Sequence, residues 1–465
     1  MTSLPYEAFI RDKLALRPPS GLECEPALPH SMFPHQRALT RWALKRGRAA
    51  IFADTGLGKS RMQLAWASEV RRYTNMPVLI LAPLAVANQT AAEGRGIGVH
   101  VNVCRSGLDV DDRGINIINY DRLHLINPEI FGGVVLDESS IIKHHDAKSF
   151  RLLTEAFRNT PFRLPATATP APNDWTELGT HAEFLGICTR AEMLAEFFTH
   201  DGGDTSVWRL KGHARAQFWR WVVSWGALIR RPSDLGFDDE AYRLPALNVH
   251  EHLVEVDAPL NGMLFAAEAQ TLTERRDARR SSLEQRVAEC AEKVNAERAE
   301  PWVVWCDLNA ESEALTAAID GAVEIRGSDD VDTKERRLAD FAEGRARVLV
   351  SKPSICGWGL NWQHAARMAF VGVTDSYEAY YQAVRRCWRF GQKREVHVHI
   401  FASKAEGSIV ANLKRKEREA GMMADALGAE TRDAVMQEVT GSHRETNEYN
   451  ASRTVQVPAW MRSAA

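Results

Sequence analysis

The 465-residue sequence predicts an α/β protein in which two mostly parallel sheets, each flanked by helices, follow one another with a helical insertion between them. Short apolar runs alternate with helical patterns over residues 31–175, and the same alternation returns over residues 246–420. A basic, tryptophan-rich stretch separates the two regions. Short apolar runs that alternate with helical segments are typical of strands covered on both faces of a parallel sheet.

The composition excludes several classes of protein. A formal net charge of −3 excludes a generally basic nucleic-acid coat, although a local basic groove remains compatible with it. The seven cysteines contain no C-x-x-C pair, which argues against a zinc site or a disulfide framework and favours a reducing compartment. No apolar run approaches the roughly 18 to 20 residues that span a membrane, and the first residues do not form a signal peptide. We therefore expect a cytoplasmic protein without a membrane partner.

The first domain is organised around the stretch Ala53-Asp54-Thr55-Gly56-Leu57-Gly58-Lys59-Ser60. It lies between an apolar run, residues 49–52, and apolar residues at helical spacing over 62–70. A strand, a glycine-containing loop and a helix in this order can turn backbone N–H groups and a helix N-terminus toward phosphates. We expect Lys59 to reach the β- and γ-phosphates of ATP and the Ser60 hydroxyl to hold Mg²⁺.

Gln36 precedes this loop in a helical pattern and is a candidate for reading the adenine edge, because its amide offers a donor and an acceptor. An ordinary surface glutamine is the alternative.

An acidic pair, Asp137-Glu138, follows the apolar run of residues 133–136. Ligands bind at the carboxyl ends of strands in such sheets. Asp137 is expected to hold Mg²⁺ through water, and Glu138 to orient and deprotonate the attacking water. Thr167 and Thr169 could connect the acidic pair to a second lobe through hydroxyl hydrogen bonds, although a proline-punctuated loop is the alternative.

The second half contains predicted strands at residues 302–306, 347–350, 369–373 and 396–401. Gln382, Arg386 and Arg389 fall at positions i, i+4 and i+7, so one helical face is predicted to present all three. Guanidinium groups brought to a γ-phosphate would stabilise the charge of the transition state. His397 and His399 alternate with apolar residues and are expected on a strand surface rather than at a metal.

These motifs resemble those of superfamily-two helicases. Residues 53–60, Asp137-Glu138 and residues 167–170 resemble motifs I, II and III, and residues 78–83 resemble motif Ia. The pattern Gln-Ala-x-x-Arg-x-x-Arg-x-Gly-Gln at residues 382–392 is similar to motif VI of the Snf-type branch, which contains chromatin remodellers and many phage and bacterial DNA translocases. Residues 356–361 resemble motif V.

The resemblance covers most of residues 31–420. It implies two RecA-like P-loop domains, ATP as substrate with Mg²⁺, and nucleic acid lying across both domains near Pro83, near residues 167–170 and from Gly357 to Asn361. The short middle region favours a phage or prokaryotic type. Two positions depart from the family pattern: Arg385 replaces the usual Asp before the first arginine of motif VI, and Ser140 replaces the usual His of motif II.

The middle region carries basic and aromatic side chains together. Residues 207–231 contain six arginines or lysines, four tryptophans and no acidic residue. Arg209 and Arg215 are candidates for nucleic-acid contact. The tryptophans are expected mainly in the core, because apolar residues recur at helical spacing from Phe218 to Trp225.

The predicted boundaries are a lead-in at 1–30, an ATP-binding domain at 31–175, an insertion at 176–245, a helicase C-terminal domain at 246–420 and a flexible polar tail at 421–465.

The sequence thus predicts a DNA-dependent ATPase that couples ATP hydrolysis to movement along DNA. It favours double-stranded DNA without sequence specificity, with replication or recombination proteins as candidate partners. An RNA helicase of the same superfamily is one alternative. A phage DNA-packaging ATPase is another, and it would require a carboxylate metal cluster in the second half. A third alternative is a nucleic-acid-binding protein with an inactive ATP site. The presence of Lys59, Asp137, Glu138 and Arg389 argues against it.

Overall fold

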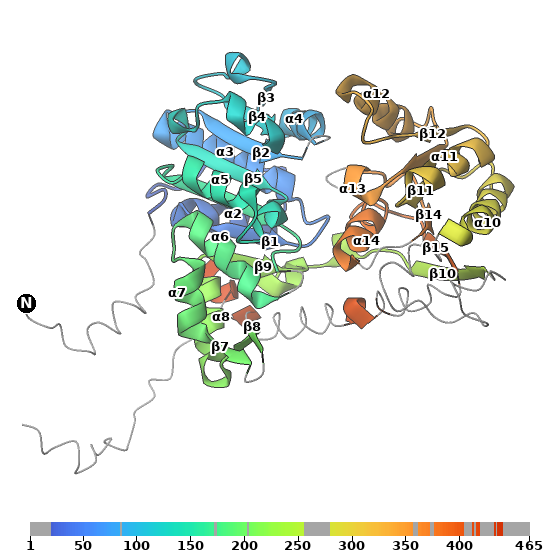
Figure 1. Cartoon of the computed structure of the whole chain (residues 1–465). Helices are drawn as coiled ribbons and strands as arrows, with labels where there is room; N and C mark the ends of the chain where they lie inside the picture. Colours follow the sequence, from blue (N-terminus) through green and yellow to red (C-terminus); the bar gives the residue numbers. More distant parts are fainter. Residues whose placement is uncertain are drawn as a thin grey trace, which may run out of the picture.

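The chain forms two α/β lobes that lie side by side (Figure 1). The computed structural model describes residues 20–83, 86–171, 174–201, 204–254, 280–356, 361–372, 376–403, 412, 415–418, 432–433 and 435–439. Each lobe is built on a parallel sheet flanked by helices, which confirms the predicted fold class. No helix in these ranges is long and apolar enough to cross a bilayer.

The first lobe contains a seven-stranded parallel sheet in the order β3-β4-β2-β5-β6-β1-β9. Its strands are β1 (Ala50–Ala53), β2 (Val78–Ala82), β3 (Asn102–Val103), β4 (Ile115–Asn119), β5 (Gly133–Asp137), β6 (Phe162–Thr167) and β9 (Gly226–Ile229). The helices in its first part are α2 (Pro34–Arg46), α3 (Lys59–Thr74), α4 (Ala87–Gly96) and α5 (Lys148–Ala156). Every residue of β1, β2 and β5 is buried, which is why these strands form continuous apolar runs in the sequence.

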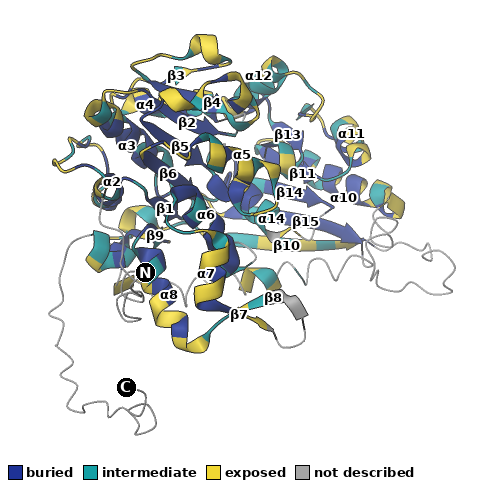
Figure 2. Ribbon diagram, turned by 60° about the vertical axis from the view of Figure 1, so that its left-hand side comes forward, coloured by how far each residue is buried: buried dark blue, intermediate teal, exposed yellow. Residues whose placement is uncertain are grey.

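The middle region belongs to the first lobe, so the predicted boundary at residue 175 is wrong. It contains α6 (Leu178–Leu185), α7 (Arg190–Phe197), the antiparallel pair β7 (Phe198–Asp201) and β8 (Asp204–Leu210), and α8 (Arg215–Val223). Phe218, Trp219 and Trp225 are buried in the first lobe's core. This packing brings β9 to the free edge of β1, and the two strands pair in parallel from Ala50↔Gly226 to Ala53↔Ile229. The tryptophans are therefore mainly core residues, as the spacing predicted. Figure 2 shows exposed residues on the outer faces of α7 and α8.

The second lobe contains a six-stranded parallel sheet in the order β10-β15-β14-β11-β13-β12. Its strands are β10 (Leu247–Val254), β11 (Trp302–Cys306), β12 (Ala322–Glu324), β13 (Val348–Ser351), β14 (Arg367–Val371) and β15 (Val396–Ser403). Its helices are α10 (Leu283–Ala296), α11 (Asn309–Ala318), α12 (Val331–Ala342), α13 (Pro353–Cys356) and α14 (Tyr377–Val384). The predicted strands all occur, with bounds that differ by at most a few residues.

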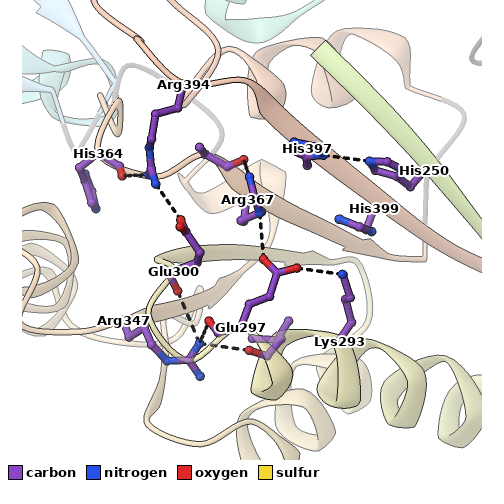
Figure 3. Close-up of polar contacts among 12 residues, drawn as sticks. His250, Lys293, Glu297, Glu300, Arg347, His364, Arg367, Arg394, His397 and His399 are labelled. Carbon is purple, nitrogen blue, oxygen red and sulfur yellow. Dashed lines mark hydrogen bonds and ion pairs between the residues drawn. The ribbon is translucent and has the colours of Figure 1, made fainter. Parts of the chain in front are cut away.

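Histidines of β10 and β15 pair side by side on one face of the second sheet. His250 Nε2 lies 3.0 Å from His397 Nδ1 (Figure 3), and His252 Nε2 lies 2.9 Å from His399 Nδ1. His399 is only 6% exposed, so its predicted place on a strand surface is wrong. Burial first, and then the charges of His250, His252 and Lys293, lower the pKa of His399 to about 3, against the opposing charge of Glu297.

Ion pairs in the same part of the lobe connect α10 and the loop after it to the sheet (Figure 3). Glu297 pairs with both Lys293 and Arg367, at 2.8 and 2.9 Å, and Glu300 pairs with Arg394 at 2.8 Å. These contacts fix the start of β11 relative to β14 and β15.

Part of the predicted C-terminal tail packs on the first lobe, which corrects its description as a flexible segment. Val435 is 1% exposed and belongs to the first lobe's core cluster, with Val439 packed against the same cluster. Arg432 Nη2 donates to the Ser233 carbonyl at 3.1 Å, and Glu438 pairs with Arg46. Apolar residues at positions i and i+4 give this short segment a side that can be buried.

Candidate active site

A cavity of about 270 Å³ lies between the two lobes and contains most of the predicted nucleotide-binding residues. The first lobe contributes predicted residues from the helix before the loop, from the loop and from the acidic pair: Gln36, Thr55, Gly56, Gly58, Lys59, Ser60, Asp137 and Glu138. The second lobe contributes Asn361, Arg386 and Arg389. The fold thus brings residues more than 300 positions apart into one pocket.

The glycine-containing loop connects β1, which ends at Ala53, to α3, which begins at Lys59. Gly58 has φ +85°, and a Cβ at this position would lie 2.1 Å from Gln36 Nε2, so the backbone conformation and the space both require glycine. Lys59 Nζ donates to the Ala53 carbonyl at 2.9 Å. Burial lowers the pKa of Lys59, while the charges of Glu138, Asp54 and Asp137 oppose that shift.

Asp137 ends β5 and lies at the base of the cavity. Gln63 of α3 donates to Asp137 Oδ1 at 2.7 Å, and the Tyr120 hydroxyl donates to the Asp137 carbonyl at 2.7 Å. Burial, followed by the charge of Glu138, raises the pKa of Asp137 to about 6, whereas the Gln63 hydrogen bond and the charge of Lys59 lower it. The Ser60 hydroxyl and the Asp137 carboxylate line the same cavity, and oxygen donors of this kind fit Mg²⁺.

Glu138 adopts a left-handed backbone conformation, with φ 52° and ψ 54°. Non-glycine residues in this region are uncommon and cost free energy, and they concentrate at functional sites. The Thr167 hydroxyl donates to Glu138 Oε2 at 3.5 Å, and the Thr169 hydroxyl donates to Glu378 Oε1 of α14 at 3.4 Å. The two threonines therefore contact the acidic pair and the second lobe.

The three residues of motif VI do not share one helical face, because α14 ends at Val384. The chain continues in turns, in which the Arg386 N–H bonds the Ala383 carbonyl and the Arg386 carbonyl accepts from the Trp362 N–H at 2.8 Å. Gln382 does not line the cavity. Its side-chain and main-chain oxygens each accept a hydrogen bond from Arg386 at 2.9 Å, so it positions the arginine that does line it. Burial lowers the pKa of Arg386 to about 10, which leaves the guanidinium charged near neutral pH.

Three aromatic residues that the sequence reasoning missed line one end of the cavity: Phe33, Tyr242 and Phe390. The Tyr242 and Phe390 rings lie 4.7 Å apart, and the Phe33 and Phe390 rings 6.0 Å apart. Gln36 connects this end to the loop, because its Nε2 donates to the Leu57 carbonyl at 2.9 Å and its Oε1 accepts from the Phe33 N–H at 3.1 Å. No sequence signal placed the three rings together, since they come from distant segments.

Asp54 and Leu57, which were also predicted to bind ATP, are not among the residues that line the cavity. The Asp54 carboxylate accepts a hydrogen bond from the Tyr381 hydroxyl at 2.6 Å and pairs with Arg385 at 3.1 Å, both from the second lobe. The sequence offered one signal for this contact, namely the departure from the motif VI pattern at Arg385.

The predicted nucleic-acid contacts are distributed over several places. Pro83 lines a second interlobe cavity of about 540 Å³, with Lys143 and Lys334 in its wall. Asn361 lines the first cavity instead, and Gly357 lies outside the described residues. Arg209 and Arg215 are exposed on β8 and α8, and neither lines the two cavities.

Comparisons with known proteins gave similarities to a protein family, a phage protein and a solved structure. Residues 286–391 match the protein family described as "Helicase conserved C-terminal domain". The "Putative protein p41" of Acyrthosiphon pisum secondary endosymbiont phage 1 is 23% identical over 449 residues, which cover 80% of this chain and 92% of that protein. A solved structure, the "Sulfolobus solfataricus SWI2/SNF2 ATPase core in complex with dsDNA", is similar with a TM-score of 0.42 and 14% identity, over 90% of this chain and 98% of that chain. The family match lies in the second lobe, and it includes Arg386 and Arg389, which line the cavity between the lobes.

Proposed function

We propose that this protein hydrolyses ATP in the interlobe cavity and uses the resulting lobe movements to travel along DNA. One observation carries the proposal. Lys59, Asp137 and Glu138 of the first lobe face the same cavity as Arg386 and Arg389 of the second. Such an arrangement is complete only when the two lobes are together, so hydrolysis becomes linked to lobe closure.

The chemistry is positioning and charge stabilisation. The backbone N–H groups of the loop and the Lys59 ammonium hold the phosphates, and Glu138 orients the attacking water and accepts its proton. Arg386 and Arg389 stabilise the negative charge that spreads over the γ-phosphoryl oxygens. Mg²⁺, held by Ser60 and Asp137, would neutralise the charge of the β- and γ-phosphates. The aromatic end formed by Phe33, Tyr242 and Phe390 suits the adenine base, and Gln36 stays a candidate for its edge.

Threonines at the end of β6 offer a route by which hydrolysis changes the lobe arrangement. Thr167 contacts Glu138, and Thr169, two residues further along, contacts Glu378 of the second lobe. If the Glu138 carboxylate moves when the γ-phosphate is lost, the movement can therefore reach an interlobe contact through residues 167–169.

DNA would lie across the cavity lined by Pro83, Lys143 and Lys334, with Arg209 and Arg215 as further phosphate contacts. The form of motif VI favours duplex DNA over RNA. Contacts of this kind read the phosphate backbone and predict weak sequence preference with a steep salt dependence.

The test is ATP hydrolysis with Mg²⁺, alone and with double-stranded DNA, single-stranded DNA or RNA. Duplex DNA is expected to stimulate hydrolysis most, and Lys59→Ala is expected to abolish it at every salt concentration. Stimulation by RNA instead would support the alternative of an RNA helicase. Hydrolysis that persists in Lys59→Ala, or none with any nucleic acid, would overturn the proposal.

The DNA contacts have their own test. Arg209→Ala and Arg215→Ala are each expected to weaken DNA binding. Each should also reduce the slope of log K against log salt concentration by about one. Arg158→Ala, which removes an exposed arginine elsewhere on the first lobe, is the matched control and is expected to bind as the unchanged protein does.

A further inference from the structure

One face of α14 is bound to the first lobe by polar contacts that do not touch the nucleotide cavity. Glu378 and Tyr381 lie at positions i and i+3 of α14, and Arg385 follows directly as the C-cap residue; all three side chains contact the first lobe. Both carboxylate oxygens of Glu378 accept from the first lobe, one from Thr169 and the other from Lys143. Both oxygens of Asp54 accept from the second lobe, one from Tyr381 and the other from Arg385.

The partners in the first lobe come from three different loops. Asp54 belongs to the glycine-containing loop, Lys143 follows the turn after the acidic pair, and Thr169 follows β6. The helix α14 and the residue that follows it therefore contact all three loops at once.

The two ion pairs have opposite polarity along α14. At its beginning the second lobe supplies the anion, Glu378, and at its end the second lobe supplies the cation, Arg385. A displaced or reversed docking of the helix would bring like charges together, which is unfavourable. The side chains are largely removed from water, with exposed fractions of 18% and 10% for Lys143 and Glu378 and 21% and 11% for Asp54 and Arg385. Such pairs are less screened than surface pairs.

Arg385 is also held in place before it meets Asp54. Its guanidinium lies over the rings of Tyr381 and Trp388, at 5.0 and 4.6 Å from their centroids. The Trp388 indole N–H donates to the Pro245 carbonyl at 2.8 Å, which anchors this group to the connection between the lobes. The next residue is Arg386, whose side chain turns into the nucleotide cavity.

We propose that the Lys143–Glu378 and Asp54–Arg385 pairs are positioning contacts that set the alignment in which Arg386 and Arg389 reach the cavity. The inference rests on the proposed ATP hydrolysis and adds to it the residues that control closure. The two ion pairs act through Arg386 and Arg389, whereas nucleotide binding depends on the glycine-containing loop. Their loss lowers kcat and changes KM little.

The experiment reverses the charges of the Lys143–Glu378 pair. If the pair aligns the lobes through its opposite charges, exchanging both residues should restore what each single reversal removes. Hydrolysis is measured without DNA, because Lys143 also lines the proposed DNA cavity. Lys143→Glu and Glu378→Lys are each expected to lower kcat about tenfold, with KM for ATP changed less than about threefold. The double variant, which restores an opposite-charge pair, is expected to recover most of the loss. Arg158→Glu reverses a charge on an exposed pair within the first lobe, with both partners 69% exposed, and is the matched control with unchanged kcat. A double variant no more active than the worse single variant, although it unfolds at the normal temperature, would overturn the inference.

A second readout does not depend on hydrolysis. Fluorophores on Leu108→Cys and Arg298→Cys, with Cys24 and Cys188 changed to Ser, report the distance between the lobes by energy transfer. Each single reversal is expected to shift the population toward longer distances, and the double variant to restore the short one. If the unchanged protein hydrolyses no ATP, the proposed function fails while these distances still decide the inference. Distances that are the same in all four proteins would overturn it.

Discussion

Replacing Gln382 with Met should impair hydrolysis without impairing nucleotide binding. Gln382 and Arg386 are each 1% exposed, and Gln382 Oε1 accepts from Arg386 Nη2 at 2.9 Å. Methionine has a similar shape but removes this acceptor from a buried guanidinium, and the loss of a buried hydrogen bond to a charged group costs about 1–3 kcal/mol. If this cost falls on the arrangement that reaches the transition state, kcat decreases about 5- to 150-fold. KM should change little, since Gln382 does not line the cavity.

The assay is steady-state phosphate release at saturating DNA, measured as a double-mutant cycle with Arg386→Met. Because Gln382 acts through Arg386, Gln382→Met is expected to cost little once Arg386 is already replaced. Thermal unfolding of each variant shows whether the protein remains folded. Equal losses in both backgrounds, or a kcat within twofold of the unchanged protein, would refute the reasoning.

Two further predictions concern other parts of the molecule. Gly56 has φ +93°, and an added Cβ would lie 2.9 Å from the Phe390 backbone nitrogen, so Gly56→Ala is expected to push the lobes apart and abolish hydrolysis. The control is Gly344→Ala, at φ +76° with open space around it, which should cost only about 1 kcal/mol of stability. An active Gly56→Ala would contradict the prediction. The pKa of His399 is about 3 in the folded protein, so this side chain stays neutral between pH 6.5 and 3 while the unfolded chain takes up a proton. As the pH is lowered through this range, the free energy of unfolding should therefore fall by up to about 1.4 kcal/mol per pH unit. Urea unfolding at several pH values should show a weaker pH dependence for His399→Gln, and an identical pH dependence would count against this explanation.

The sequence predicts the site best where function depends on a short, continuous segment. The loop ending in Lys59 and Ser60, and the acidic pair at residue 137, have strong local patterns, and they meet in one cavity as expected. The short strand β9 has no such signal, because four residues pair with β1 only after the buried tryptophans bring them there. The end of α14 at Val384 also depends on a distant partner, since the N–H of Trp362 binds the Arg386 carbonyl that a continued helix would use.

Charged contacts between the lobes were harder still to predict. Arg385 is recognisable in the sequence as a departure from a pattern, but its partner lies 331 residues away in the chain. A single sequence carries no information on such pairs, because either charge alone is typical of a solvated surface.

The return of residues 435–439 to the first lobe has a mechanical consequence. Residues before β10 pack on the first lobe, and so do residues 435–439, which follow the second lobe in the chain. Val435 lies in the same core cluster as Leu235, and Phe237 and Tyr242 pack against that cluster. Tyr242 also lines the nucleotide cavity. A substitution that loosens Val435 would therefore disturb the packing behind Tyr242, a residue of the cavity wall.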